Sequence, residues 1–266
     1  MSEIADFAER IAREAGELIR REREQNTLRT DYKQQTELVT HADVMADEYI
    51  TNAIRQAYPD HRILSEETMP DLTQAEELDT PLWIVDPIDG TVNYAYGHPQ
   101  VAVSIAWAEK GRVQVGVVHA PFANETFRAE KGQGATLNGG PIQHSGATDL
   151  RQSLFATGFP YTKDNLEPLV RRLNVMIHHC RDLRRIGSAA LDICWVACGR
   201  LDAYYETVSP WDFAAAKLIA REAGAKAGHF SEVPEGYPED LWGKDNVITA
   251  PGIYDGVRAL LVSASG

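Results

Sequence analysis

The sequence predicts an α/β (α+β) fold built from stacked layers of helix and sheet, and two patterns support this prediction. Residues 101–130 hold three β-rich runs separated by short turn signals, which indicates a meander. From about residue 150 onward, strand-like and helix-like segments alternate, as in α/β layers. We therefore expect two halves that form one compact unit. Residues 1–145 would carry a mixed, largely antiparallel sheet, and residues 146–266 an α/β arrangement.

The first half opens with two expected helices. Residues 1–24 repeat apolar side chains at helical spacing, at Ile4, Phe7, Ile11, Ala15, Leu18 and Ile19. A polar loop is expected over residues 30–43, and Thr40 can cap a second helix that ends near Ala57. Short strands in "RILSEE" and "LWIVD" flank an acidic loop over residues 69–81. The glycine-rich "GQGATLNGGP" lacks the spacing of a nucleotide-binding loop and predicts turns.

Strands and helices alternate in the second half. We expect strands in "SLFATGF", "DLRRI", "LDAYYE", "AKAGHF" and "NVITA". The expected helices are "NLEPLVRRLNVMIHHC", "SAALDICWVACG", "PWDFAAAKLIAREAG" and "GIYDGVRALLVSA". Pro210 near the start of the third of these helices, and Gly199 and Gly224 after the ends of the second and third, are typical of helix boundaries.

Composition and charge narrow the class of protein. Hydrophobic residues make up 44% and charged residues 24% of the 266 positions, which is ordinary for a soluble globular protein. The formal net charge of -13 argues against a DNA-wrapping or anionic-membrane surface, so we expect neither direct nucleic-acid binding nor a membrane partner. The same charge is compatible with an acidic site that gathers cations, but on charge alone a merely acidic surface is the favoured explanation.

Cysteine usage and the N-terminus indicate a cytoplasmic protein. Cys180, Cys194 and Cys198 cannot pair off completely and show no zinc-site spacing, so buried thiols in a reducing compartment are expected. The N-terminal stretch lacks the apolar core of a signal peptide. No segment approaches the roughly 18 apolar residues that a membrane span needs.

The stretch "WIVDPIDGTVNY", residues 83–94, holds the main chemical signal. We expect the strand to stop at Asp86, because Pro87 cannot continue a central ladder. Gly90 permits a tight turn, and the N–H groups of a short helical turn that begins at Thr91 suit an anion such as phosphate. Asp86 and Asp89 would repel that anion unless a cation lay between them. Mg²⁺ with oxygen ligands fits this need.

Spacing excludes two alternative sites. An EF-hand loop needs acidic side chains at alternate positions, and Ile88 occupies one of them. The haloacid-dehalogenase phosphatases use the first aspartate of an Asp-x-Asp-Gly-Thr run as the nucleophile, and Pro87 stands at that position here. A covalent aspartyl-phosphate is therefore not expected. The sequence instead predicts a water nucleophile activated by a metal.

Three motifs together resemble the inositol monophosphatase family, which is grouped with fructose-1,6-bisphosphatases and 3′-phosphoadenosine phosphatases. They are "VDPIDGT", "SEE" upstream and "SPWDFAAAKLIAREAG" downstream, and the resemblance runs from "TELVTHAD" to the last helix. It implies a layered α-β-α-β-α sandwich of the sugar phosphatase type and a Mg²⁺-dependent phosphomonoesterase. It also implies lithium inhibition and a homodimer.

The resemblance implies that two or three Mg²⁺ bind in each active site. One ion would be held by Glu66, Asp86 and the carbonyl of Ile88, and a second by Asp86, Asp89 and Asp212. By itself, Asp212 is also explained as a first-turn acid that favours the helix dipole. The mechanism would use these ions to activate the nucleophile and to stabilise the leaving group.

The resemblance also implies the catalytic residues. Asp43 and the Thr91 hydroxyl would orient and deprotonate the water, and Glu66 belongs to the same catalytic group. The backbone of Gly90 and Thr91 would bind the phosphate. Taken on spacing alone, Asp43 lies three residues after Thr40 and fits a helix-capping arrangement.

Several further residues carry weaker signals. Lys33 sits in a polar stretch, and the family places a mobile loop lysine near the metals. Glu67 is an alternative to its neighbour Glu66 as a ligand. Arg184 and Arg185 could bind anions or an opposing subunit, but structural ion pairing explains them more simply.

The resemblance implies that the second half reads the substrate. Gly187, Ser188 and Ala189 would begin a helix next to the leaving alcohol, and Glu206 would accept hydrogen bonds from substrate hydroxyls. Two metal ligands, Asp89 and Asp212, would contact the substrate as well. Without the resemblance, Glu206 is equally explained as a surface glutamate at a strand end.

The preferred substrate is expected to be myo-inositol 1-phosphate or a similar polyol phosphate. Histidinol phosphate, fructose 1,6-bisphosphate, 3′-phosphoadenosine 5′-phosphate and NADP are alternatives with the same chemistry. A hypothesis of another class is a binding protein that acts on RNA-processing or transcription machinery. Substitution Asp89→Asn separates the classes, because binding should survive it and phosphatase activity should not.

Overall fold

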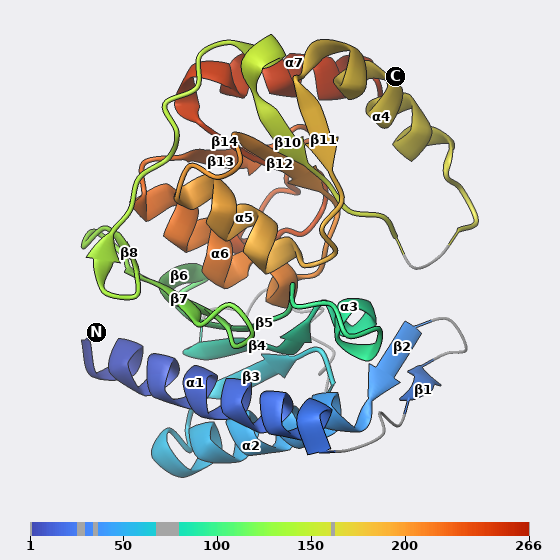
Figure 1. Cartoon of the computed structure of the whole chain (residues 1–266). Coiled ribbons are helices and arrows are strands. Elements are labelled where there is room, and N and C mark those ends of the chain that lie inside the picture. The colour runs from blue at the N-terminus through green and yellow to red at the C-terminus, as the bar shows by residue number, and fades with distance from the viewer. Residues whose placement is uncertain (1, 26–29, 34–36, 68–79, 161–162, 266) are drawn as a thin grey trace.

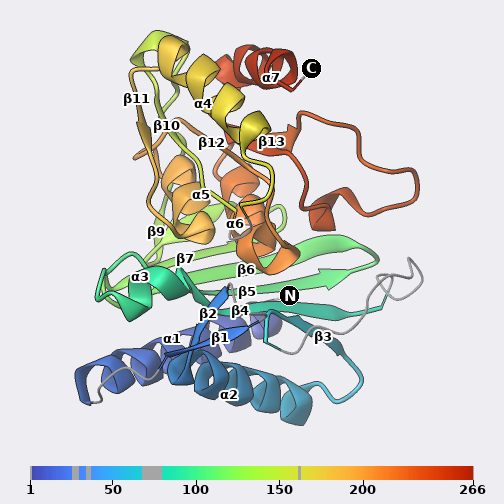
Figure 2. The same cartoon turned by 90° about the vertical axis from the view of Figure 1, so that its right-hand side faces the viewer.

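The computed structural model describes residues 2–25, 30–33, 37–67, 80–160 and 163–265, with backbone alone over 30–33 and 37–39. Five layers are stacked in this region (Figures 1 and 2). From one end to the other they are a helix pair, a seven-stranded sheet, a second helix pair, a five-stranded sheet and a third helix pair. The order confirms the predicted α-β-α-β-α sandwich.

The larger sheet confirms the predicted meander. It is antiparallel except for the parallel pairing of its first two strands. Its strands in spatial order are β3 (Arg62–Ser65), β4 (Leu82–Asp89), β5 (Ala102–Glu109), β6 (Arg112–Ala120), β7 (Glu125–Glu130), β8 (Ala135–Leu137) and β9 (Gly140–Pro141).

The smaller sheet is mixed. Its strands in spatial order are β11 (Asp182–Arg184), β10 (Leu154–Ala156), β12 (Ala203–Glu206), β14 (Asn246–Thr249) and β13 (Lys226–His229). β10 runs parallel to both of its neighbours, and β14 runs antiparallel to both of its own. All five strands were expected from the alternating pattern.

The helices form the other three layers. α1 (Ser2–Gln25) and α2 (His41–Ala57) cover the outer face of the larger sheet. α5 (Ala189–Ala197) and α6 (Pro210–Glu222) lie between the sheets, and α4 (Glu167–His179) and α7 (Tyr254–Ser263) cover the smaller sheet (Figure 1). The short α3 (Thr91–Ala95) follows β4, and single 3-10 turns occupy Leu150–Gln152, Glu239–Leu241 and Pro251–Ile253.

Packing of α6 against the larger sheet sets the geometry of the middle layer. The first half of α6 carries three consecutive small residues, Ala214, Ala215 and Ala216, all buried. Gly116 of β6 permits the close approach, because a Cβ there would lie 2.5 Å from the carbonyl oxygen of Ala215. The N-terminus of α6 is therefore fixed close above the ends of β4 and β5.

Three local expectations were wrong. Within the expected loop over residues 30–43, β1 (Thr30–Lys33) and β2 (Glu37–Thr40) pair antiparallel, and α2 begins at His41. The sequence looked polar, but a two-stranded ribbon needs backbone pairing rather than an apolar face. Strand β4 continues past Asp86 to Asp89, and "GQGATLNGGP" contains two short strands beside its turns.

The remaining expectations are confirmed, lie outside the described residues or stay predictions. α2 begins after Thr40 and ends at Ala57, as predicted. The acidic loop over residues 69–81 lies almost wholly outside the described residues. The division into halves at residue 145 stays a prediction. Within the described part of the chain, no helix combines the length and the apolar character that crossing a bilayer requires.

Candidate active site

A bulge in β4 brings two carboxylates to one face of the sheet. Residues 82 and 84 pack toward the middle helices and residues 83 and 85 toward α1 and α2, so Asp86 faces the middle layer by strict alternation. Three residues further on, Asp89 would face the opposite side in a regular strand. The pairing shifts instead, because Asp86 lies opposite Ser104 and Asp89 opposite Ala102. The extra residue restores Asp89 to the face of Asp86.

Pro87 lies inside this bulge, where a missing N–H group costs no ladder hydrogen bond. The Ile88 N–H donates to Oδ1 of Asp86 over 3.0 Å, which fixes that carboxylate. We had predicted that Pro87 would end the strand at Asp86, but the bulge accommodates this proline and β4 continues to Asp89. Ile88 itself points into the core beneath α1 and α2.

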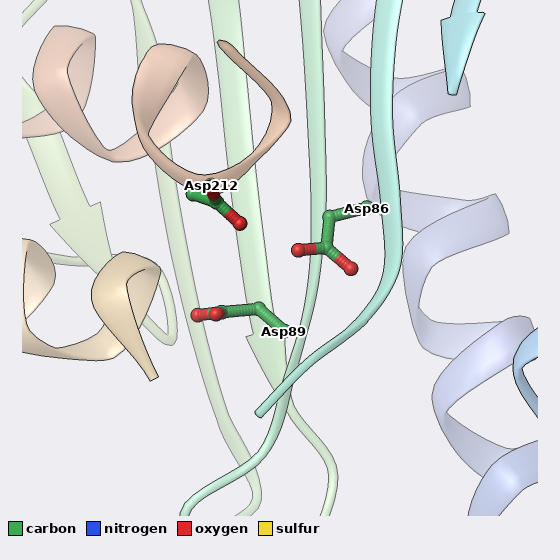
Figure 3. A group of neighbouring side chains, drawn as sticks. All are labelled: Asp86, Asp89 and Asp212. Atoms are coloured by element: carbon green, nitrogen blue, oxygen red, sulfur yellow. The ribbon is translucent and has the colours of Figure 1, made fainter. Parts of the chain in front are cut away.

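The third carboxylate comes from the middle helix layer. Asp212 stands in the first turn of α6, and its Oδ2 accepts from the Ser209 N–H over 2.7 Å in a capping box. Ligand oxygens of Asp86, Asp89 and Asp212 lie within 4.8 Å of one another. Figure 3 shows the three side chains converging from β4 and from the start of α6.

Electrostatics within the described residues show that the carboxylates of this cluster oppose one another's ionisation. Burial raises the pKa of Asp86 well above its usual range, and the charge of Glu66 raises it further. Burial likewise raises the pKa of Asp212 well above its usual range, and the charge of Asp89 adds to the effect. Convergent carboxylates with raised pKa values, two of them buried and one half-buried, form an oxygen donor set that fits a hard divalent cation such as Mg²⁺.

Glu66 follows β3 directly and approaches the cluster from the strand beside β4. Its N–H donates to the carbonyl of Val85 over 3.2 Å. A side-chain hydrogen bond between Glu66 and Asp86 contributes to the raised pKa of Asp86. The structure therefore places the predicted fourth ligand next to the three aspartates. Glu67 is half-buried beside it, and its charge acts on Asp43.

Asp89 is also held by the start of α5, which the sequence did not indicate. The Ala190 N–H donates to its Oδ2 over 2.8 Å, and the Ala189 N–H to its Oδ1 over 3.2 Å. The Ser188 hydroxyl donates to Oδ2 over 2.5 Å. Burial raises the pKa of Asp89 to about 6, and these donors oppose the rise because they stabilise the charged form.

The proposed proton acceptor lies on the other side of β4. Thr91 Oγ1 lies 3.2 Å from Oδ1 of Asp43 and 3.1 Å from the carbonyl oxygen of Ile88. The other Asp43 oxygen accepts from the N–H of Thr40 over 2.7 Å and from its hydroxyl over 2.5 Å. Asp43 therefore caps α2 and contacts Thr91 at once. Burial raises its pKa to about 6.

Gly90 is required by the way the chain turns from β4 into α3. Its φ of 96° lies in the left-handed region, and a Cβ would lie 2.8 Å from the carbonyl oxygen of Gln100. The turn places Thr91 at the first position of α3. The structure thus brings Gly90, Thr91 and Asp43 together, as predicted.

A cleft joins the aspartates to the predicted substrate residues. It is lined by residues of both sheets and of the middle layer, among them Asp89, Gly90, Gly187, Ser188, Ala189, Glu206 and Asp212. Oε2 of Glu206 accepts from the Tyr204 hydroxyl over 2.6 Å. Burial raises the pKa of Glu206 to about 7, so this carboxylate is not the surface group that sequence alone allowed.

Some residues are placed otherwise or were missed. Lys33 stands on β1 opposite Glu37, and its side chain lies outside the described part of the chain. Arg184 pairs with Asp182 over 2.6 Å, as expected of structural ion pairing, whereas Arg185 lines the cleft. Asp192 lines it too, and no signal in the sequence distinguished this helix residue from a surface acid.

Asp47 was also missed in the sequence analysis, although its position beside Asp43 could have been inferred. It lies four residues after Asp43 and so on the same face of α2. The Ser65 hydroxyl donates a hydrogen bond to its Oδ1. Because Ser65 directly precedes Glu66, this contact ties the end of β3 beside the predicted ligand Glu66 to α2.

The chain is similar to known proteins over nearly its whole length. Residues 1–263 match the model of the inositol monophosphatase family. The Nus factor SuhB of Pasteurella multocida is 41% identical over 234 residues, covering 87% of this chain and 86% of that protein. Inositol monophosphatase 1 of Solanum lycopersicum is 41% identical over 228 residues, covering 84% and 83%. The Thermotoga maritima IMPase structure covers 99% of this chain and 98% of its own, with a TM-score of 0.83 and 32% identity.

Proposed function

The chain belongs to the inositol monophosphatase family, and on that premise we propose that it is a Mg²⁺-dependent phosphomonoesterase. The observation that carries the proposal is the convergence of Asp86, Asp89 and Asp212 within 4.8 Å. Two buried carboxylates and a half-buried third repel one another and would repel a phosphate as well. A bound divalent cation removes both costs, because it attracts the carboxylates and the phosphate alike.

The chain offers ligands for two or three ions. Glu66, Asp86 and the Ile88 carbonyl would hold one ion, and Asp86, Asp89 and Asp212 another. Mg²⁺ bound there would supply the charge that neutralises the phosphate, acidifies a water nucleophile and stabilises the departing alkoxide. Uncatalysed hydrolysis of phosphate monoesters is among the slowest of biological reactions, with enzymatic accelerations up to about 10²¹-fold.

The protein's own residues handle the proton. Thr91 Oγ1 would accept a hydrogen bond from the attacking water and pass the proton on to Asp43, whose Oδ1 lies 3.2 Å away. The raised pKa of Asp43, about 6, keeps this carboxylate mostly ionised at neutral pH yet basic enough to take a proton. The N–H groups of Gly90 and Thr91 would hold the phosphate in place.

The substrate we favour is myo-inositol 1-phosphate or a similar polyol phosphate. The half-buried Glu206 supports this choice, because a carboxylate held by Tyr204 can accept hydrogen bonds from hydroxyls on the leaving group. Histidinol phosphate, fructose 1,6-bisphosphate, 3′-phosphoadenosine 5′-phosphate and NADP are the alternatives. We further expect lithium inhibition, a homodimer and a cytoplasmic location, the last because the three cysteines are free.

A second function has one observation in its favour. A relative that is 41% identical over most of the chain is named a Nus factor. A role as a binding protein in transcription or RNA processing is therefore the alternative, either beside catalysis or in its place. The net charge of -13 argues that such a role would use protein contacts rather than direct nucleic-acid binding.

Phosphate release from a panel of esters tests both functions. The panel holds the five candidate substrates, each with and without Mg²⁺, and compares the wild type with Asp89→Asn. Mg²⁺-dependent release with a preference for inositol 1-phosphate, lost in Asp89→Asn, supports the proposal. Release from another ester alone keeps the chemistry and changes the substrate. A folded protein that releases phosphate from none of them contradicts the proposal and favours the binding function.

A further inference from the structure

Asp192 is a buried carboxylate whose side chain is not held by the protein. It lies on α5, one turn after the helix start at Ser188, and only 2% of its surface is exposed. Its Oδ1 finds no hydrogen-bond partner in the described residues. No ion pair reaches the side chain within the same part of the chain. Burying a carboxylate without partners costs free energy that a structural residue would avoid.

The position of Asp192 relates it to the candidate site. Asp192 lines the same cleft as the metal-binding Asp89 and Asp212 and as Glu206. Its neighbours there are held: Glu206 accepts from Tyr204, and Asp89 accepts from the start of α5. Asp192 is thus the cleft carboxylate that keeps its acceptor capacity for a ligand.

We propose that Asp192 is a specificity-determining residue that accepts a hydrogen bond from a second hydroxyl of the leaving alcohol. The inference rests on the proposed phosphatase function and narrows its substrate class to esters of polyols. Glu206 on β12 and Asp192 on α5 would then each accept a hydrogen bond from a different hydroxyl of the substrate. An ester whose alcohol has no second hydroxyl leaves Asp192 unpaired and gains nothing from it.

Kinetics on two substrates test the proposal. Myo-inositol 1-phosphate carries further hydroxyls, and phenyl phosphate carries none. For Asp192→Leu we expect kcat/KM on the inositol ester to fall about 10- to 100-fold, the loss of one charge-assisted hydrogen bond, mainly through KM. Asp192→Asn keeps an acceptor oxygen and should lose less. On phenyl phosphate both variants should stay within about twofold of the wild type.

Stability separates recognition from a structural role. Because the carboxylate is unpaired, Asp192→Leu should keep or raise the melting temperature of the protein. Asp255→Asn removes an acid whose side chain is 89% exposed and serves as a matched control. It should change kcat/KM on neither ester. Equal losses on both esters, or a lowered melting temperature with parallel losses, would assign Asp192 to the fold and overturn the proposal.

Binding distinguishes this proposal from the phosphatase function itself. Calorimetry with myo-inositol 1-phosphate in Ca²⁺ reports recognition without turnover. If the wild type releases phosphate from none of the candidate esters with Mg²⁺ present, the proposed function fails, and the calorimetry still decides the role of Asp192. Weaker binding in Asp192→Leu than in Asp192→Asn supports it. Equal binding in both variants and the wild type, or no binding by the wild type, overturns it.

Discussion

The Ser188 hydroxyl donates a hydrogen bond over 2.5 Å to Oδ2 of Asp89, although 99 positions separate the two residues. The contact joins the start of α5 to the bulge of β4. It makes one carboxylate serve as the cap of a helix and as a member of the acidic cluster. The middle helix layer and the larger sheet are therefore coupled at the candidate metal site.

Ser188→Ala should weaken both roles of this contact. We expect a loss of about 1 kcal/mol in the free energy of unfolding, typical of a lost N-cap. Mg²⁺ affinity should fall as well, because Asp89 loses a donor that stabilises its charged form. Urea denaturation and Mg²⁺ calorimetry measure the two effects. Ser263→Ala, which removes an exposed hydroxyl on α7, is the control. An unchanged Mg²⁺ affinity would refute the coupling.

Asp43→Asn should abolish proton transfer while leaving the metal site intact. An asparagine oxygen can still accept from the Thr40 N–H, so α2 keeps much of its cap. We expect kcat to fall about 10²- to 10⁴-fold, the usual contribution of a general base. Phosphate-release kinetics and Mg²⁺ calorimetry together check this.

Substitutions at Thr91 provide the partner test. Thr91→Ser keeps the hydroxyl 3.2 Å from Asp43 and should retain most activity, whereas Thr91→Val should lose activity as Asp43→Asn does. Activity close to that of the wild type in Thr91→Val would show that the proton takes another route.

Gly90→Ala should destabilise the turn that positions Thr91. Two causes add up, the left-handed φ of 96° and a Cβ only 2.8 Å from the Gln100 carbonyl oxygen. We expect a loss of about 1–3 kcal/mol from the backbone strain alone, and more from the contact. Gly97→Ala is a matched control, because Gly97 has a φ of 81° with nothing within 4 Å of an added Cβ. If urea denaturation shows equal losses of unfolding free energy in the two variants, the close contact with Gln100 contributes nothing.

Lys217 should make stability depend on pH. This buried lysine of α6 lies 3.0 Å from Nε2 of His229 and 3.1 Å from Oδ1 of Asn246, and burial lowers its pKa to about 7. Between pH 7 and the unfolded pKa near 10.5, the unfolded chain binds more protons than the folded one. The free energy of unfolding therefore rises with pH in that window, by about 1.4 kcal/mol per unit of pKa difference.

Lys217→Met removes this dependence. The free energy of unfolding of the variant should exceed that of the wild type by the largest amount at about pH 6.5. This difference should shrink toward pH 10. Urea denaturation of both proteins across this range measures the difference. A difference that stays constant with pH would mean that Lys217 keeps an ordinary pKa in the fold.

Local signals in the sequence were sufficient for most of the fold. The periodicity of α1, the cap at Thr40 and the alternation of the second half each depend on neighbours in the chain. From the residues alone, the site was predictable where its members share one segment, as Asp86, Asp89, Gly90 and Thr91 do. The distant Asp43, Glu66 and Asp212 were named only through the family resemblance.

Contacts between distant segments were not predictable in this way. The cap that Asp89 provides for α5 depends on how α5 packs above β4, which no local pattern reports. The unpaired state of Asp192 likewise appears only once its surroundings are known. The bulge at Pro87 could have been found, because a proline inside an apolar strand between two acids is better explained by a bulge than by a strand end.

The most direct test of the central claim is a Mg²⁺ titration of phosphate release. The protein is first stripped with EDTA, and release from myo-inositol 1-phosphate is then followed as Mg²⁺ is added to the wild type and to Asp212→Asn. We expect no phosphate release without Mg²⁺ and a saturable recovery of release in the wild type. In Asp212→Asn the recovery of release should be far smaller and should need more Mg²⁺. Release by the stripped wild type, or equal titrations of the two proteins, would contradict a metal site built on these aspartates.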